Sequence, residues 1–172
     1  SVVIAQFGLI RTYRNHVSWL NWLCLWGGIG FGVMIKGPVT PLVIFLTVLV
    51  VSIIDREVKW VLKLKPLSGF SLVACICLPW IISIQIQSSG EFLQSSLGQD
   101  LLPKLLSGVE SHGLPPGYYL LLALITLWPG SLFIYPALKF AINSRKTNTI
   151  KFLFAWVIPT WVMLEIIPTK LP

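Results

Sequence analysis

The chain has 172 residues, of which 55% are hydrophobic and only 11% are charged, and its formal net charge is +7. A water-soluble domain carries roughly 25% charged residues, so this composition excludes an ordinary soluble domain and indicates an integral membrane protein. A strongly basic chain can also bind nucleic acid. Here the 13 Lys and Arg residues are spread over short segments that flank apolar runs, so we expect no nucleic-acid partner.

The first apolar run, residues 1–10, is uncharged but short. It has half of the roughly 20 residues that a helix needs to cross the hydrocarbon core. It also lacks the basic start and the small-residue cleavage site of a signal peptide. We interpret it as a truncated membrane helix, and residues 1–172 as an internal part of a single transmembrane domain.

Five longer apolar runs follow, and only the last contains a charged residue, Glu165. They are residues 17–35, 37–54, 67–90, 113–138 and 152–169. Each run is long enough for a spanning helix, the shorter ones only just. The sequence therefore predicts an all-α, polytopic transmembrane helix bundle with about five spans plus a truncated one. The cluster Gly27, Gly28, Gly30 and Gly32 within one run predicts close helix packing.

The positive charges predict the orientation of these spans. Ten of the 13 Lys and Arg residues lie in residues 11–16, 55–66 and 139–151. An excess of Lys and Arg marks cytoplasmic loops, so we assign residues 55–66 and 139–151 as cytoplasmic loops. The other three cations, Lys36, Lys104 and Lys170, then lie on the opposite side.

The longest segment on that opposite side is residues 88–117. Its Leu and Phe residues recur at three-to-four-residue spacing, which predicts short amphipathic helices that lie on the membrane or cover a cavity. Pro103 divides the segment, because proline cannot donate to a continuous helix.

Four polar residues on this side are candidates for a functional site. Lys36 and Lys170 lie at span ends, where lysines bind a lipid phosphate as point charges or anchor the helix at the interface. Asp100 and His112 lie in the loop, where they could line a cavity or could simply be solvated. Cys75 and Cys77 are two residues apart and point to different faces of a helix, which disfavours a disulfide or a metal-binding pair.

Several motifs occur in order along the chain. They are Lys36-Gly37-Pro38, Pro79-Trp80, residues 98–102 (Gly-Gln-Asp-Leu-Leu), residues 110–113 (Glu-Ser-His-Gly), residues 116–119 (Pro-Gly-Tyr-Tyr), residues 128–131 (Trp-Pro-Gly-Ser) and residues 168–172 (Pro-Thr-Lys-Leu-Pro). Together they resemble the bacterial relatives of the protein O-mannosyltransferases and the lipid A aminoarabinose transferases. These are membrane glycosyltransferases of the GT-C type.

The resemblance implies transfer of a sugar from a polyprenyl-phosphate carrier to a lipid or protein acceptor, at the periplasmic face of the bacterial inner membrane. The family's catalytic acidic residues lie near its N-terminus, so they are expected upstream of residue 1 and the fragment alone should be inactive. A departing phosphate needs nearby cations, and we infer that Lys36 and Lys170 supply them and bind the donor phosphate. The resemblance also implies that Asp100 and His112 belong to the loop that covers the cavity, where His112 could help to position the phosphate or a divalent metal ion.

Two other interpretations stay open. A transporter or flippase component would also carry charged residues at span ends, but it would show internal repeats, and no clear repeat is visible. A membrane anchor or assembly subunit would not gather Lys36, Asp100, His112, Glu165 and Lys170 on one side. The transferase interpretation is therefore preferred.

Overall fold

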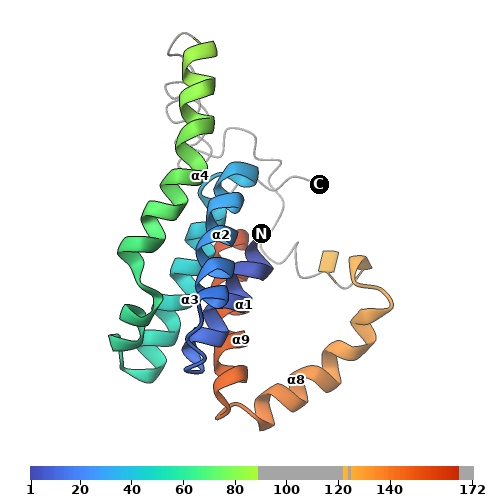
Figure 1. The fold of residues 1–172 in the computed structure, drawn as a ribbon. Helices are drawn as coiled ribbons and strands as arrows, with labels where there is room; N and C mark the ends of the chain where they lie inside the picture. The colour runs from blue at the N-terminus through green and yellow to red at the C-terminus, as the bar shows by residue number, and fades with distance from the viewer. Residues whose placement is uncertain (89–121, 124, 167–172) are drawn as a thin grey trace.

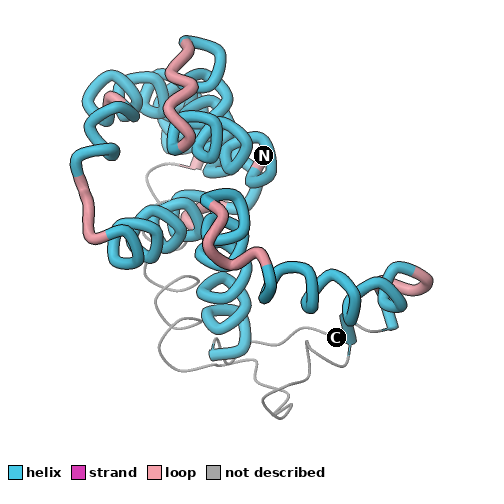
Figure 2. Tube along the Cα trace, turned by 90° about the horizontal axis from the view of Figure 1, so that it is seen from below, coloured by secondary structure: helices cyan, strands magenta, loops and turns pink. Residues whose placement is uncertain are grey.

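The structure, a computed structural model, describes residues 1–88, 122–123 and 125–166. Every regular element among these residues is a helix (Figures 1 and 2), which confirms the all-α prediction for this part of the chain. The elements are α1 (Val2–Tyr13), α2 (Trp19–Lys36), α3 (Val39–Asp55), η1 (Lys59–Leu64), α4 (Pro66–Gln87), η3 (Gly130–Phe133), α8 (Ile134–Asn143) and α9 (Asn148–Ile166).

The core lies where α1 and α2 form a hairpin that packs against neighbouring helices. α2 contacts α3 and α4. α3 packs along α9, so the helices of the N-terminal half contact the last described helix (Figure 1). The buried apolar side chains come from these helices and from η1. They are Ala5, Leu9, Leu25, Trp26, Ile29, Ile44, Val51, Trp60, Leu64, Phe152 and Ala155. Segments that are distant in sequence therefore share one core.

Glycines allow the hairpin helices to approach closely. A Cβ added to Gly8 of α1 would lie 2.7 Å from the backbone nitrogen of Leu25, and one added to Gly28 of α2 would lie 2.9 Å from that of Ala5. Both distances are too short for a real Cβ, so each helix presents a glycine to the backbone of the other. The predicted packing role is confirmed for Gly28, and also for Gly30 and Gly32, but not for Gly27, which has open space around it.

Two buried hydrogen bonds fix the register between helices. The Gln6 side-chain amide donates to the Thr47 hydroxyl at 2.8 Å, linking α1 to α3. The Trp26 indole donates to the Leu64 carbonyl at 2.8 Å, linking α2 to η1. In an apolar environment these groups have few alternative partners, so the bonds specify which helix faces pair.

Four of the predicted spans correspond to α2, α3, α4 and α9. Within the described residues, α4 is the one helix that is both long and apolar enough to cross a membrane. α1 and α3 are shorter apolar helices. Length and composition of the helices thus support one span directly.

The predicted span over residues 113–138 is wrong in its second half. Helical structure at residues 125–126 gives way to a turn at 127–129, after which η3 and then α8 run outside the bundle and return to it at α9 (Figure 1). Pro129 lacks an N–H and pushes the preceding residue out of the helical region, and Gly130 follows it directly. Residues 113–121 lie outside the described part of the chain.

Candidate functional site

Of the four predicted site residues, the structure describes only Lys36. It is the exposed last residue of α2, followed by Gly37 with φ of 63°, a left-handed conformation that suits glycine at the turn into α3. Asp100, His112 and Lys170 lie outside the described residues, as does the predicted amphipathic loop over most of its length. The proposed grouping of these four residues therefore stays a prediction.

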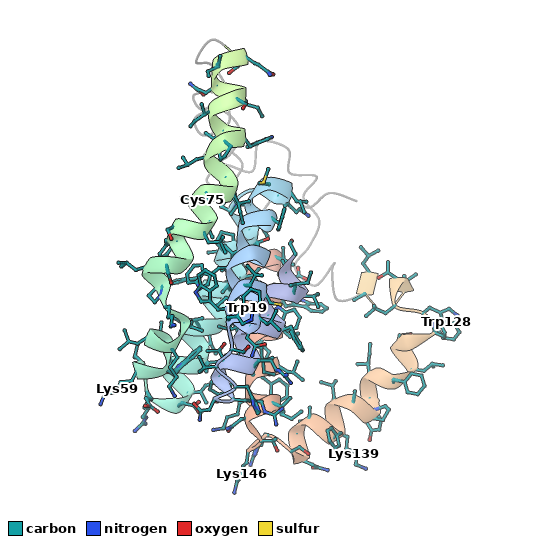
Figure 3. All side chains as sticks on the ribbon, viewed as in Figure 1. Trp19, Lys59, Cys75, Trp128, Lys139 and Lys146 are labelled. Carbon is teal, nitrogen blue, oxygen red and sulfur yellow. The ribbon has the colours of Figure 1, made fainter. Side chains whose placement is uncertain are left out.

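At the other end of the bundle, side chains from three basic segments meet. The Tyr13 hydroxyl donates to Asp55 Oδ2 at 2.5 Å, and Lys151 Nζ donates to Asp55 Oδ1 at 3.1 Å. A further bond, from Lys63 Nζ to Asn15 Oδ1 at 2.7 Å, links residues 11–16 to residues 55–66. Lys59, Lys139 and Lys146 also lie toward this end (Figure 3). The three segments that carry ten of the 13 cations thus share one end of the molecule.

Aromatic rings surround the Tyr13–Asp55–Lys151 network. The Tyr13 ring packs edge-on against Trp60, with centroids 5.4 Å apart, and stacks on Phe152 at 6.1 Å. Burial favours the neutral carboxyl group, but the hydrogen bonds from Tyr13 and Lys151 and the charge of Lys151 outweigh it and hold the pKa of Asp55 below its ordinary value. Burial, together with Asp55, raises the pKa of the Tyr13 hydroxyl. The network is an ionised carboxylate held between a phenol and an ammonium group.

This geometry makes the stability of the protein depend on pH. Because the folded pKa of Asp55 is lowered from 3.8, its contribution is present above that pH and is lost as the pH falls through the folded value. Asp55→Asn keeps the shape but removes the charge. We expect it to lower the free energy of unfolding at pH 7 by about 2 kcal/mol and to flatten the fall in stability below pH 4. Thermal unfolding in detergent from pH 3 to 7 measures both.

Glu57→Gln is the matched control, because it removes an exposed carboxylate two residues away. It should leave stability at pH 7 unchanged. An Asp55→Asn variant as stable as the control at pH 7 would show that the network contributes nothing.

A groove lies between α9 and the short segments at residues 122–123 and 125–126. Its volume is about 420 Å³. Its lining residues are Leu122, Ala123, Thr126, Trp156, Val157, Thr160, Trp161 and Leu164. The hydroxyls of Thr126 and Thr160 donate to carbonyls of their own helical turns, at 2.9 Å and 2.6 Å. With those hydroxyls satisfied, the groove presents hydrocarbon and indole surface, which suits an apolar chain rather than a polar ligand.

Sequence reasoning missed both the network and the groove. Asp55 is the first residue after an apolar run, and a carboxylate there usually needs a partner, but its partners are 42 and 96 residues away in the sequence. Glu165, the acidic residue within the last predicted span, is half-buried near the end of α9. No group of three or more His, Cys, Asp or Glu side chains that could hold a metal ion occurs within the described ranges.

No family model matches the chain, and no solved structure matches it. The chain is similar to the undecaprenyl phosphate-alpha-4-amino-4-deoxy-L-arabinose arabinosyl transferase 1 of Pseudomonas fluorescens, with 26% identity over 162 residues. The match covers 94% of this chain but only 29% of that protein, so the chain spans less than a third of its relative's length. The likeness indicates a distant relationship between this chain and part of that arabinosyl transferase.

Proposed function

We propose that the full-length protein is a polytopic membrane glycosyltransferase that moves a sugar from a polyprenyl-phosphate carrier to a lipid or protein acceptor. The observation that carries this proposal is the likeness to an undecaprenyl phosphate arabinosyl transferase along 94% of the chain. A likeness that extends over nearly the whole chain favours a shared mode of donor binding over a chance match within one apolar helix.

The groove beside α9 supports the same donor class. A polyprenyl carrier consists of a long isoprenoid chain attached to a phosphate, and the chain needs an apolar surface within or beside the bilayer. Trp156, Val157 and Trp161 offer such a surface along one face of α9. We assign the isoprenoid chain to this groove.

The distribution of charge supports the orientation. The basic segments meet at one end of the bundle through the contacts of Asp55 and Lys63, and the positive-inside rule makes this the cytoplasmic end. α2 rises about 27 Å over its 18 residues, close to the roughly 30 Å hydrocarbon core. Lys36, at the far end of α2, would then lie at headgroup level on the periplasmic face of a bacterial inner membrane.

In this scheme Lys36 and Lys170 bind the donor phosphate, and Asp100 and His112 lie in the loop that covers the cavity. The catalytic acidic residues belong to the part of the protein upstream of residue 1. A divalent metal ion could assist the departing phosphate, and His112 is the residue proposed to help to position it.

Donor transfer by the reconstituted full-length protein tests the proposal. We expect Val157→Trp, which fills the groove, to raise the KM for a long-chain polyprenyl-phosphate sugar about ten-fold, since its chain loses apolar contact. The KM for a donor with a short prenyl chain should change little. Val162→Trp is the control, because Val162 is equally exposed on α9 (49% against 50%) but does not line the groove.

Two outcomes would contradict the proposal. If wild-type protein carries the lipid-linked sugar across the bilayer without transferring it, the protein is a flippase. If Val157→Trp and Val162→Trp affect the long-chain donor equally, the groove does not bind the isoprenoid chain.

A further inference from the structure

A second pocket lies at the basic end of the bundle, away from the groove. It has a volume of about 420 Å³ and is formed by the start of α2, by η1 and by the first turn of α4. Its lining residues are Val17, Ser18, Trp19, Trp22, Lys63, Lys65 and Ser68. Two ammonium groups, two hydroxyls and two indoles thus line one cavity, and the transferase scheme uses none of them.

The backbone holds the two lysines in place. Lys65 adopts a left-handed conformation with φ of 48°, and α4 begins at the next residue, Pro66. The Lys65 carbonyl accepts a hydrogen bond from the Ser68 hydroxyl at 3.0 Å, which fixes the turn. Lys63 is oriented by its bond to the neutral Asn15 side chain. Neither lysine forms an ion pair within the described residues, so both charges remain available to an anion.

Acidic groups do not compete for these lysines. Asp55 is engaged by Tyr13 and Lys151. The Ser18 hydroxyl makes no capping bond to α2, and the buried indole N–H of Trp22 has no hydrogen-bond partner among the described residues. The pocket therefore combines two ammonium groups with a serine hydroxyl that makes no capping bond, a combination that suits phosphate oxygens.

The rim of the pocket distinguishes a lipid from a soluble anion. Val17 and Trp19 are 55% and 69% exposed beside the lysines. Apolar and aromatic side chains next to basic residues are typical of the headgroup level of a membrane, where the ring contacts the glycerol and acyl region. A free phosphate ion would gain nothing from this apolar rim.

We propose that this pocket binds the headgroup phosphate of an anionic phospholipid in the cytoplasmic leaflet. The proposal rests on the membrane orientation given above, but it concerns a different lipid at the opposite face from the sugar donor. The lysines contact the phosphate, the Ser18 hydroxyl donates a hydrogen bond to it, and Trp19 contacts the lipid backbone.

Native mass spectrometry of the full-length protein in detergent tests this proposal, with phosphatidylglycerol and phosphatidylcholine as probes. Wild-type protein should retain phosphatidylglycerol preferentially. Each of Lys63→Gln and Lys65→Gln should weaken that binding about five-fold, and the double variant about 25-fold. The variants Lys63→Arg and Lys65→Arg should retain it. Phosphatidylcholine binding should not change.

Lys59→Gln and Lys146→Gln are matched controls, because both residues are exposed cations toward the same end that do not line the pocket (Figure 3). Equal losses in the controls would overturn the site in favour of a diffuse charge effect. Displacement of phosphatidylglycerol by millimolar inorganic phosphate would overturn the lipid assignment. Sugar transfer is not the readout, so failure here leaves the proposed transferase activity standing, and the reverse also holds.

Discussion

We expect sugar transfer from a polyprenyl-phosphate donor to fall about 100-fold when Lys36 or Lys170 of the full-length protein is replaced by alanine, with membrane insertion unchanged. As the sugar leaves, negative charge develops on the phosphate. A positioned cation at the rim of a low-dielectric site stabilises that charge more in the transition state than in the ground state. Loss of one such group typically costs 10²–10³-fold in rate.

The separate effects on kcat and KM distinguish stabilisation of the departing phosphate from simple anchoring of the helix in the membrane. A lysine that stabilises the departing phosphate lowers kcat more than it raises the KM for the donor. Lys36→Arg should recover much of the rate because it keeps the charge. Lys146→Ala, at the opposite end of the bundle, is the control and should transfer sugar normally. Unchanged transfer by both Lys36→Ala and Lys170→Ala would remove the phosphate site from the scheme.

The second large effect concerns the α1–α2 hairpin. Gly8→Ala would place a methyl group against the Asn21 carbonyl oxygen and 2.7 Å from the Leu25 nitrogen. Both neighbours belong to helix backbone and cannot rotate away, so the two helices must separate. Separation weakens the contact of Leu9 with the core and strains the Gln6–Thr47 bond. We expect a loss of about 3 kcal/mol in the free energy of unfolding.

Gly27→Ala provides the comparison within the same hairpin. Gly27 lies inside α2 with no neighbouring atom within 4 Å of an added Cβ. Alanine favours helix by about 1 kcal/mol over glycine, so this variant should unfold at the wild-type temperature or slightly above. Thermal unfolding in detergent measures both variants. If they unfold at the same temperature, the close approach of α1 and α2 does not stabilise the fold.

The sequence predicted helices well where apolar length alone decides the structure. The runs that became α2, α3, α4 and α9 have helical ends within a few residues of their predicted limits. Proline alone does not decide where a helix ends. Pro79 and Pro159 lie inside continuous helices, where the Ser83 and Thr160 hydroxyls bond to carbonyls at and near the prolines. Pro129 is followed by Gly130 and ends its helix, a distinction that apolar length cannot make.

The sites were less predictable, because their parts come from distant segments. The position of Lys36 at an exposed helix end follows from its place after an apolar run. The pairing of Tyr13, Asp55 and Lys151 does not, since it depends on α3 lying beside α9. The two lysines of the second pocket were counted as topology signals, and that they share a cavity follows only from the placement of η1 and the start of α4 beside the start of α2. Lys170, Asp100 and His112 stay predictions.

The position of α8 outside the bundle has a consequence for how this region is oriented. None of its ten residues is buried, although Tyr135, Leu138 and Phe140 are apolar. A helix of under three turns has little stability of its own in water. Its direction therefore depends on whatever surrounds it, lipid or neighbouring protein, and residues 144–147 form the joint at which those surroundings would set its angle to α9.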